Sequence, residues 1–122
     1  MADTIVWITG ATEGIGLGLA RNCPFESARI INLSRRDHPD YESVRFDLTK
    51  PETWGAVRDH LAAELAAFTG KRAIFIQNGY YSQGVGLLHK VAAAPYENSV
   101  IANVAAPIAL GRAFIAACPP QL

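Results

Sequence analysis

The feature that most constrains this chain is a glycine-rich turn within residues 4–20, where the sequence reads TIVWITGATEGIGLGLA. An apolar run ends at Gly10, Gly14 and Gly16 follow at close spacing, and a helical pattern then begins. Gly10 permits a tight turn, Gly14 lets a phosphate approach the backbone, and Gly16 lets the helix lie close to the strand. The first N–H groups of such a helix attract phosphate. This order of elements predicts a dinucleotide site, although an ordinary glycine-rich strand–turn–helix corner would have the same pattern.

Composition narrows the class of protein. The 122 residues are enough for one domain with a sizeable core, and half of them are hydrophobic. Basic and acidic residues balance at 11 each, so we expect neither nucleic acid nor a membrane surface as a partner. The two cysteines show no metal-ligand spacing, and no basic region precedes the first apolar run. We therefore expect no metal site, packing thiols and a reducing, cytoplasmic location.

One apolar segment, residues 100–118, resembles a membrane span in hydropathy. Asn103, Pro107 and Arg112 interrupt it. An arginine near the centre of a span costs about 2.5–3.5 kcal/mol on insertion scales. The segment is predicted to be a buried helix of a soluble protein.

The hydrophobic pattern alternates between short apolar runs and helical stretches along the whole chain. Strands are expected at residues 5–8, 29–33, 44–47 and 72–77, and helices at residues 15–22, 49–70 and 95–118. Residues 34–42 are polar with a central proline, so a loop joins the second and third strands. This alternation predicts an α/β fold with a parallel sheet covered on both faces, within a single domain over residues 1–122.

The pattern Thr9-Gly10-x-x-x-Gly14-Ile15-Gly16 resembles the nucleotide loop of the short-chain dehydrogenase/reductase family. The resemblance extends over residues 4–114 and implies a Rossmann-like doubly wound sheet with strand order 3-2-1-4. It also implies NAD(P) as the cofactor, held by a loop whose candidate contact residues are Gly10, Thr12, Glu13, Gly14, Ile15 and Gly16.

Ser34, Arg35 and Arg36 follow the second strand, where an NAD-selective member of this family would usually place an acid. Two guanidinium groups at this point can hold the 2′-phosphate of NADP, so we expect NADP rather than NAD. A solvated basic turn is the alternative. Glu13 points the other way, because many NADP-binding members carry a basic residue at that position.

Two further segments match the family at strand ends. Asp47-Leu48 looks like the pair that contacts the adenine, although a strand end running into a helix cap, with Thr49 and Glu52 as a capping box, would also fit. Asn78-Gly79 partly matches the Asn-Asn-Ala-Gly segment that lies beside the cofactor. Tyr80 stands where glycine is usual.

Asn103 lies in the long helix, where the family has an asparagine that supports a water linked to the catalytic lysine. Asparagine is a poor helix former, so its presence between apolar neighbours needs a reason. The alternative interpretation is a satisfied amide in the core.

The catalytic residues of the family are missing. Hydride transfer between nicotinamide and a carbonyl or alcohol substrate uses a serine and a Tyr-x-x-x-Lys pair, and none of the four tyrosines has a lysine four residues later. We therefore expect this chain to be the front half of a longer, homo-oligomeric protein, truncated after the fourth strand and its helix. A front half would leave the edge of the fourth strand and part of the long helix exposed.

Two other classes remain open. The chain could be a nucleotide-binding module without chemistry, including a fragment that needs a partner. It could also be a methyltransferase, because residues 14–18 read Gly-Ile-Gly-Leu-Gly; the lack of an acid after the second strand disfavours this class.

Overall fold

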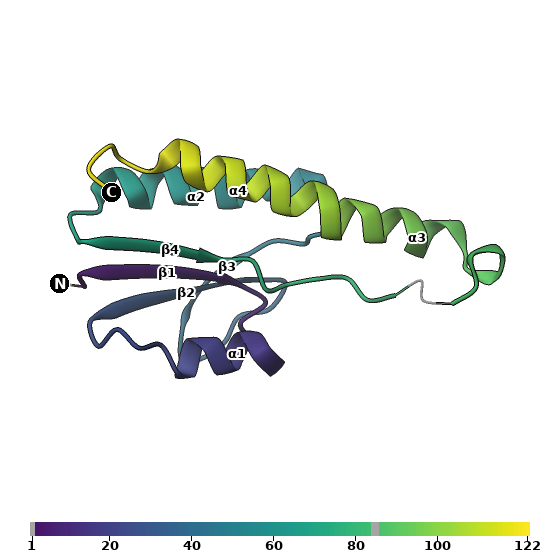
Figure 1. The fold of residues 1–122 in the computed structure, drawn as a ribbon, viewed down its shortest axis with the longest axis horizontal. Helices are drawn as coiled ribbons and strands as arrows, with labels where there is room; N and C mark the ends of the chain where they lie inside the picture. Colours follow the sequence, from purple (N-terminus) through teal and green to yellow (C-terminus); the bar gives the residue numbers. More distant parts are fainter. Residues whose placement is uncertain (1, 84–85) are drawn as a thin grey trace.

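The computed structural model describes residues 2–83 and 86–122. Their strands form one parallel sheet in the order β3-β2-β1-β4, with β1 at Thr4–Thr9, β2 at Ala28–Ser34, β3 at Glu42–Arg45 and β4 at Arg72–Ile76 (Figure 1). The predicted order 3-2-1-4 is confirmed. The third strand ends at Arg45, two residues earlier than the pattern predicted, so Phe46 and Asp47 belong to the following turn.

Helices cover both faces of the sheet, as the alternating pattern predicted. Figure 1 shows α1 (Gly14–Arg21) on one face, and α2 (Trp54–Ala67) with α4 (Ala106–Ala117) on the other. Helix α2 follows a short 3₁₀ turn, η1 (Pro51–Thr53), and a second 3₁₀ turn, η2 (Leu88–Lys90), precedes α3 (Ala93–Val100). The segment between β4 and η2 includes residues 84 and 85, which lie outside the described part of the chain.

Strand β1 is the centre of the molecule, and all six of its residues are buried. Because side chains alternate along a strand, Ile5 and Trp7 face α2 and α4, whereas Val6 and Ile8 pack with Ala20 of α1. The hydrophobic cluster that contains Ile5 and Trp7 also includes buried side chains from the two helices on that face: Val57, Leu61 and Leu65 from α2, and Leu110 from α4. A strand buried on both faces explains why its sequence is a continuous apolar run.

The predicted capping box at Thr49 and Glu52 is wrong. The Asp47 carboxylate accepts hydrogen bonds from the Thr49 N–H (2.8 Å) and the Thr49 hydroxyl (2.7 Å), so Thr49 closes an Asx turn instead of capping a helix. The Thr53 hydroxyl accepts from the Asp47 N–H at 2.9 Å and joins the end of β3 to the start of α2. An acid two residues before Thr49 offers a closer partner than α2, which begins five residues after it.

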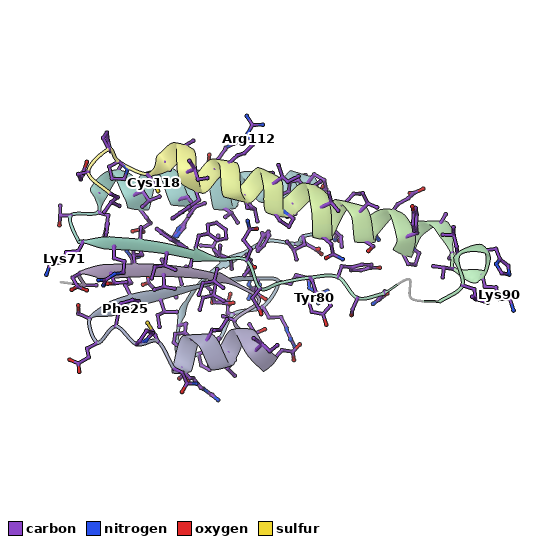
Figure 2. All side chains as sticks on the ribbon, viewed as in Figure 1. Phe25, Lys71, Tyr80, Lys90, Arg112 and Cys118 are labelled. Carbon is purple, nitrogen blue, oxygen red and sulfur yellow. The ribbon has the colours of Figure 1, made fainter. Side chains whose placement is uncertain are left out.

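The predicted long helix is continuous from Ala93 to Ala117, with a π-helical segment, η3 (Ile101–Ala105), between α3 and α4. By length and composition it could cross a membrane, with a mean hydropathy of 1.7 over its most apolar stretch, yet only 17% of that stretch is buried. The prediction of a buried helix is therefore wrong for most of the segment, which is buried on one side only, through Ala102, Ala106 and Leu110. Arg112 projects away from the sheet (Figure 2).

Candidate dinucleotide site

The glycine turn between β1 and α1 has the backbone that its sequence predicted. Gly10 and Gly14 have φ angles of 75° and 57°, in the left-handed region that glycine adopts without strain. The Gly10 N–H donates to the Leu33 carbonyl at 2.9 Å, which joins the turn to the end of β2. A Cβ at Gly14 would meet no atom within 4 Å, so the backbone there faces open space.

Gly16 is the closest packing point of the turn. A Cβ built on it would lie 1.9 Å from the Gly10 carbonyl oxygen and 2.7 Å from the Asn78 amide nitrogen. The helix therefore packs on the turn itself as well as beside the strand. Glu13, at the N-cap position, makes no side-chain capping bond, so its carboxylate does not occupy the first-turn N–H groups of α1. These groups are available to an anion.

Two other candidate residues of the loop differ in exposure. Ile15 is 78% exposed although it is apolar, whereas Thr12 is half-buried. An exposed apolar side chain beside the open backbone of Gly14 is suited to contact with the apolar parts of a bound ligand.

The end of β4 is tied to the end of β1. The Gly79 N–H donates to the Thr9 hydroxyl at 2.9 Å, and the Asn78 side-chain amide donates to the carbonyls of Thr9 (3.3 Å) and Gly10 (3.4 Å). Asn78 thus supports the glycine turn from the neighbouring strand. Tyr80, which the sequence analysis singled out, is 74% exposed and follows these contacts along the chain.

The basic turn after β2 lies beside the glycine turn. Ser34 ends the strand, and Arg35 and Arg36 are exposed. Arg36 forms an ion pair with Glu13 at 3.3 Å, and both side chains are more than half exposed. The Glu13 carboxylate therefore pairs with the Arg36 guanidinium, which a 2′-phosphate would also need. In the sequence, Arg36 favoured NADP as the cofactor and Glu13 did not, and the structure places the two side chains in contact.

Asp47 and Leu48 complete the edge of the site. Leu48 lies next to Gly79, where a Cβ on the glycine would be 3.3 Å from the leucine Cδ1. The carboxyl ends of all four strands therefore carry candidate residues. This edge is where parallel α/β sheets bind ligands.

Asn103 is not a core amide, because its side chain is exposed and pairs with the backbone of Tyr81. Its Oδ1 accepts from the Tyr81 N–H and its Nδ2 donates to the Tyr81 carbonyl, each at 2.8 Å. Pro107 has no N–H and cannot give the Asn103 carbonyl its usual helical hydrogen bond, which accounts for the π-helical segment at this point. Asn103 fastens the loop after β4 to the long helix.

Sequence reasoning missed two residues that hold the site together. The Thr9 hydroxyl accepts from Gly79, and Asn32, which is fully buried in β2, bonds to both the glycine turn and the basic turn. A signal for Asn32 was present, because it is a polar residue inside the apolar run RIINL.

Comparison with known proteins agrees with this geometry. No protein-family model matches the chain. It is 28% identical to the short chain dehydrogenase andC of Emericella variicolor, in an alignment covering 94% of this chain and 47% of that protein.

Solved structures match the fold closely. A short-chain dehydrogenase/reductase from Burkholderia vietnamiensis gives a TM-score of 0.85 at 22% identity, covering 97% of this chain and 58% of that chain. Another from Brucella ovis, in complex with a partially ordered NAD, gives 0.75 at 23% identity, covering 95% and 57%.

A parallel sheet in the order 3-2-1-4, with a glycine turn at its centre and helices on both faces, defines a Rossmann-like α/β protein. Within that class, the proteins that the chain resembles are short-chain dehydrogenases/reductases, at 28% identity or less. It spans about half the length of the relatives it matches.

Proposed function

We propose that this chain is the cofactor-binding half of an NADP-preferring oxidoreductase, which transfers hydride between nicotinamide and a small carbonyl or alcohol substrate. The observation that carries the proposal is the meeting of an open glycine turn and an exposed arginine pair at one edge of the sheet. Bound NADP would supply the hydride-carrying nicotinamide.

Each candidate residue has a role that its position supports. The main-chain N–H groups of residues 10–16 would hold the pyrophosphate, and Arg35 and Arg36 would hold the 2′-phosphate, with Ser34 beside them. Asp47 and Leu48 would contact the adenine, and Asn78 and Gly79 would support the turn from β4. NADP needs this separate argument, because the Brucella ovis relative was solved with NAD.

The chain's own contribution to catalysis would come from Asn103. Its side chain is held by Tyr81. Because Pro107 has no N–H to donate to the Asn103 carbonyl, we propose that this oxygen accepts a hydrogen bond from water. We place the catalytic serine and the Tyr-x-x-x-Lys pair in sequence outside these 122 residues.

We also propose that the protein is a homo-oligomer that associates through the exposed side of the long helix, and that neither nucleic acid nor a membrane is its partner. The balanced charge supports the second part. Five apolar side chains along that helix are about half exposed or more, and these support the first part: Tyr96, Val100, Val104, Ile108 and Ile115.

A nucleotide-binding module without chemistry is the alternative function. NADPH and a panel of ketones separate the two: turnover by the full-length protein supports the oxidoreductase, whereas binding without turnover supports the module. Tighter binding of S-adenosylmethionine than of NADPH would instead support a methyltransferase.

The test of cofactor choice is the replacement Arg35→Ala. Loss of a charged hydrogen bond should weaken NADPH binding by about 1–3 kcal/mol, as measured by calorimetry, and leave NADH binding nearly unchanged. Arg58→Ala is the matched control, because Arg58 is also exposed but lies on α2 with Asp59 as its partner. Equal weakening of both nucleotides by Arg35→Ala, or the same effect from Arg58→Ala, would reject the 2′-phosphate role.

A further inference from the structure

Asn32 is a fully buried polar residue in the middle of an apolar strand. Buried amides need hydrogen-bond partners, because an unsatisfied polar group in a protein interior is costly. Its partners come from two separate loops, the glycine turn and the basic turn. The residue therefore links the two parts of the proposed cofactor site.

Three hydrogen bonds make this link. The Asn32 Oδ1 accepts from the Ala11 N–H at 3.1 Å in the glycine turn. Its Nδ2 donates to the Arg36 carbonyl at 2.9 Å and to the Ser43 hydroxyl at 3.0 Å.

Only an amide satisfies all three partners. The Ala11 N–H requires an acceptor and the Arg36 carbonyl requires a donor, so the orientation of the Asn32 amide is determined by its surroundings. An aspartate would place an oxygen against the Arg36 carbonyl, and a leucine would leave all three groups without their partner. The choice of asparagine is thus explained by the need to bridge the two turns.

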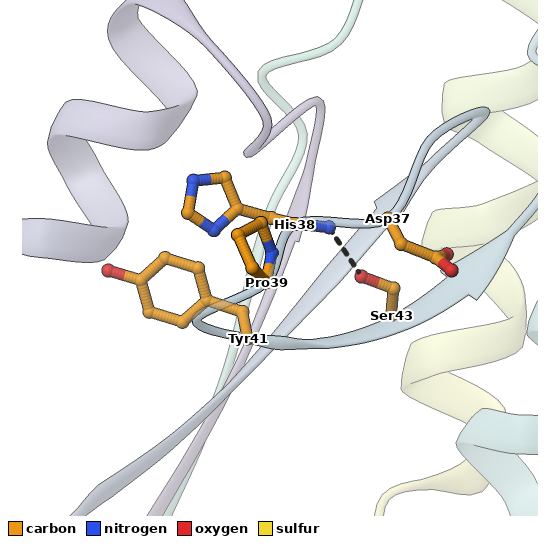
Figure 3. A pocket seen from close by; sticks show the side chains of 5 residues that line it. All are labelled: Asp37, His38, Pro39, Tyr41 and Ser43. Atoms are coloured by element: carbon orange, nitrogen blue, oxygen red, sulfur yellow. Dashed lines mark hydrogen bonds between the residues drawn. The ribbon is translucent and has the colours of Figure 1, made fainter.

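Ser43 extends the link into the basic turn. Its hydroxyl also accepts from the His38 N–H at 3.4 Å, as Figure 3 shows in the pocket lined by Asp37, His38, Pro39, Tyr41 and Ser43. The backbone of residues 36–38 is therefore held at two points, the Arg36 carbonyl and the His38 N–H. The Arg36 carbonyl bonds directly to Asn32, and the His38 N–H is connected to Asn32 through the Ser43 hydroxyl.

We propose that Asn32 is a positioning residue for cofactor discrimination, which holds the arginine turn at a fixed place relative to the glycine turn. The inference rests on the proposed function, in which one dinucleotide has its pyrophosphate on the glycine turn and its 2′-phosphate on the arginine turn. The two phosphate positions are joined covalently in the ligand. The guanidinium groups can therefore reach the 2′-phosphate only if the two turns keep their separation.

Ser43→Ala is the principal test, because replacing the buried Asn32 itself can prevent folding. The variant removes the bonds of the hydroxyl to Asn32 and His38 and leaves the contact of Asn32 with Ala11 in place. We expect NADPH binding to weaken by about threefold to tenfold, the effect of one or two hydrogen bonds, and NADH binding to stay within about twofold. Ser27→Ala is the control, because its hydroxyl donates to Asp3 at 2.7 Å at the opposite edge of the sheet.

A second readout needs no cofactor. Because Asn32 joins the two turns, Ser43→Ala should also speed hydrogen exchange at the Ala11 amide, which Ser43 does not contact, and Ser27→Ala should not. A purely structural serine would change neither the exchange at Ala11 nor the ratio of NADPH to NADH affinity.

The outcomes separate this inference from the proposed function. If the wild-type protein prefers NADPH and Ser43→Ala keeps that preference, the positioning role is overturned and the proposed function stands. If the wild-type protein binds neither nucleotide, the proposed function fails; unchanged exchange at Ala11 would then overturn the link as well. Loss of NADPH preference together with faster exchange at Ala11 supports both.

Discussion

Gly16 and Gly18 are two residues apart on α1, and the structure gives them opposite surroundings. A Cβ at Gly16 would lie 1.9 Å from the Gly10 carbonyl oxygen, whereas a Cβ at Gly18 would meet nothing within 4 Å. Gly16→Ala should therefore force the turn and helix apart and lower the free energy of unfolding by about 1–3 kcal/mol. Gly18→Ala should raise it by about 0.5–1 kcal/mol, because alanine is the better helix former.

Urea denaturation of the two variants measures both effects on one helix. The same pair also reports on the site, since Gly16→Ala should weaken NADPH and NADH together and Gly18→Ala should weaken neither. Two variants with equal stability would show that the helix does not pack on the turn as closely as the structure has it.

At the scale of single residues, the sequence predicted the backbone conformation of the turn better than it predicted side-chain contacts. The spacing of Gly10, Gly14 and Gly16 predicted a turn with left-handed residues, because backbone sterics act locally. The backbone partners of Asn32 and Asn103 lie 4 to 22 residues away and have no sequence signal of their own. Both residues were visible only as polar exceptions in apolar surroundings.

Helix α2 is held on the sheet by a hydrogen bond that depends on pH. The indole N–H of Trp7, in β1, donates to His60 Nε2 at 2.9 Å, so the imidazole must be neutral at that nitrogen. Burial lowers the pKa of His60 below its ordinary value; Glu64 and Glu42 oppose this shift, and Arg29 adds to it. A proton on Nε2 would end the hydrogen bond and place a cation against a buried donor.

The sign of the effect on stability follows from this lowered pKa. Above about pH 6.5 the histidine is neutral in both folded and unfolded chains, and the contact contributes fully. Below that pH the unfolded chain takes up the proton first, so the free energy of unfolding falls until the folded chain is protonated too. Denaturation at pH 7.5 and 5.5 should show this loss in the wild-type protein.

His60→Gln is the matched variant, because the oxygen of the glutamine side chain can accept a hydrogen bond from Trp7 and does not titrate between pH 5.5 and 7.5. The loss between pH 7.5 and 5.5 should shrink in His60→Gln and persist in His89→Gln, whose histidine lies in the 3₁₀ turn before α3. A loss of the same size in both variants would assign it to other groups.

The elements themselves were largely predictable, because buried strands and amphipathic helices have clear periodicities. The errors occurred where a local hydrogen bond competes with a helix signal. Asp47 holds Thr49 in a turn in place of the predicted capping box. The long helix, in which Pro107 predicted an irregularity, contains a π-helical segment just before that proline.

At the scale of the whole molecule, β4 is an edge strand of the sheet that the described residues form. Its last four residues are only half-buried, in contrast to the fully buried β1 that it pairs with. The long helix beside it presents the exposed apolar residues named above, in a stripe at mostly four-residue spacing. The expected strand order already implied that the edge of the fourth strand and part of the long helix would be exposed.

The proposed self-association can be tested at Ile108, which is 60% exposed within that stripe. Burying an isoleucine side chain stabilises an interface by about 1.5–3 kcal/mol. The Ile108→Glu variant should therefore self-associate at least about tenfold more weakly than the wild-type protein, as measured by sedimentation over a concentration series. Leu19→Glu is the control, because Leu19 is an exposed apolar residue on α1, on the opposite face of the sheet. Association that both variants weaken equally would place the interface elsewhere, and a wild-type protein that stays monomeric would refute self-association through this helix. A wild-type protein that floats with neutral lipid vesicles, and stops doing so in Ile108→Glu, would assign the stripe to a membrane instead.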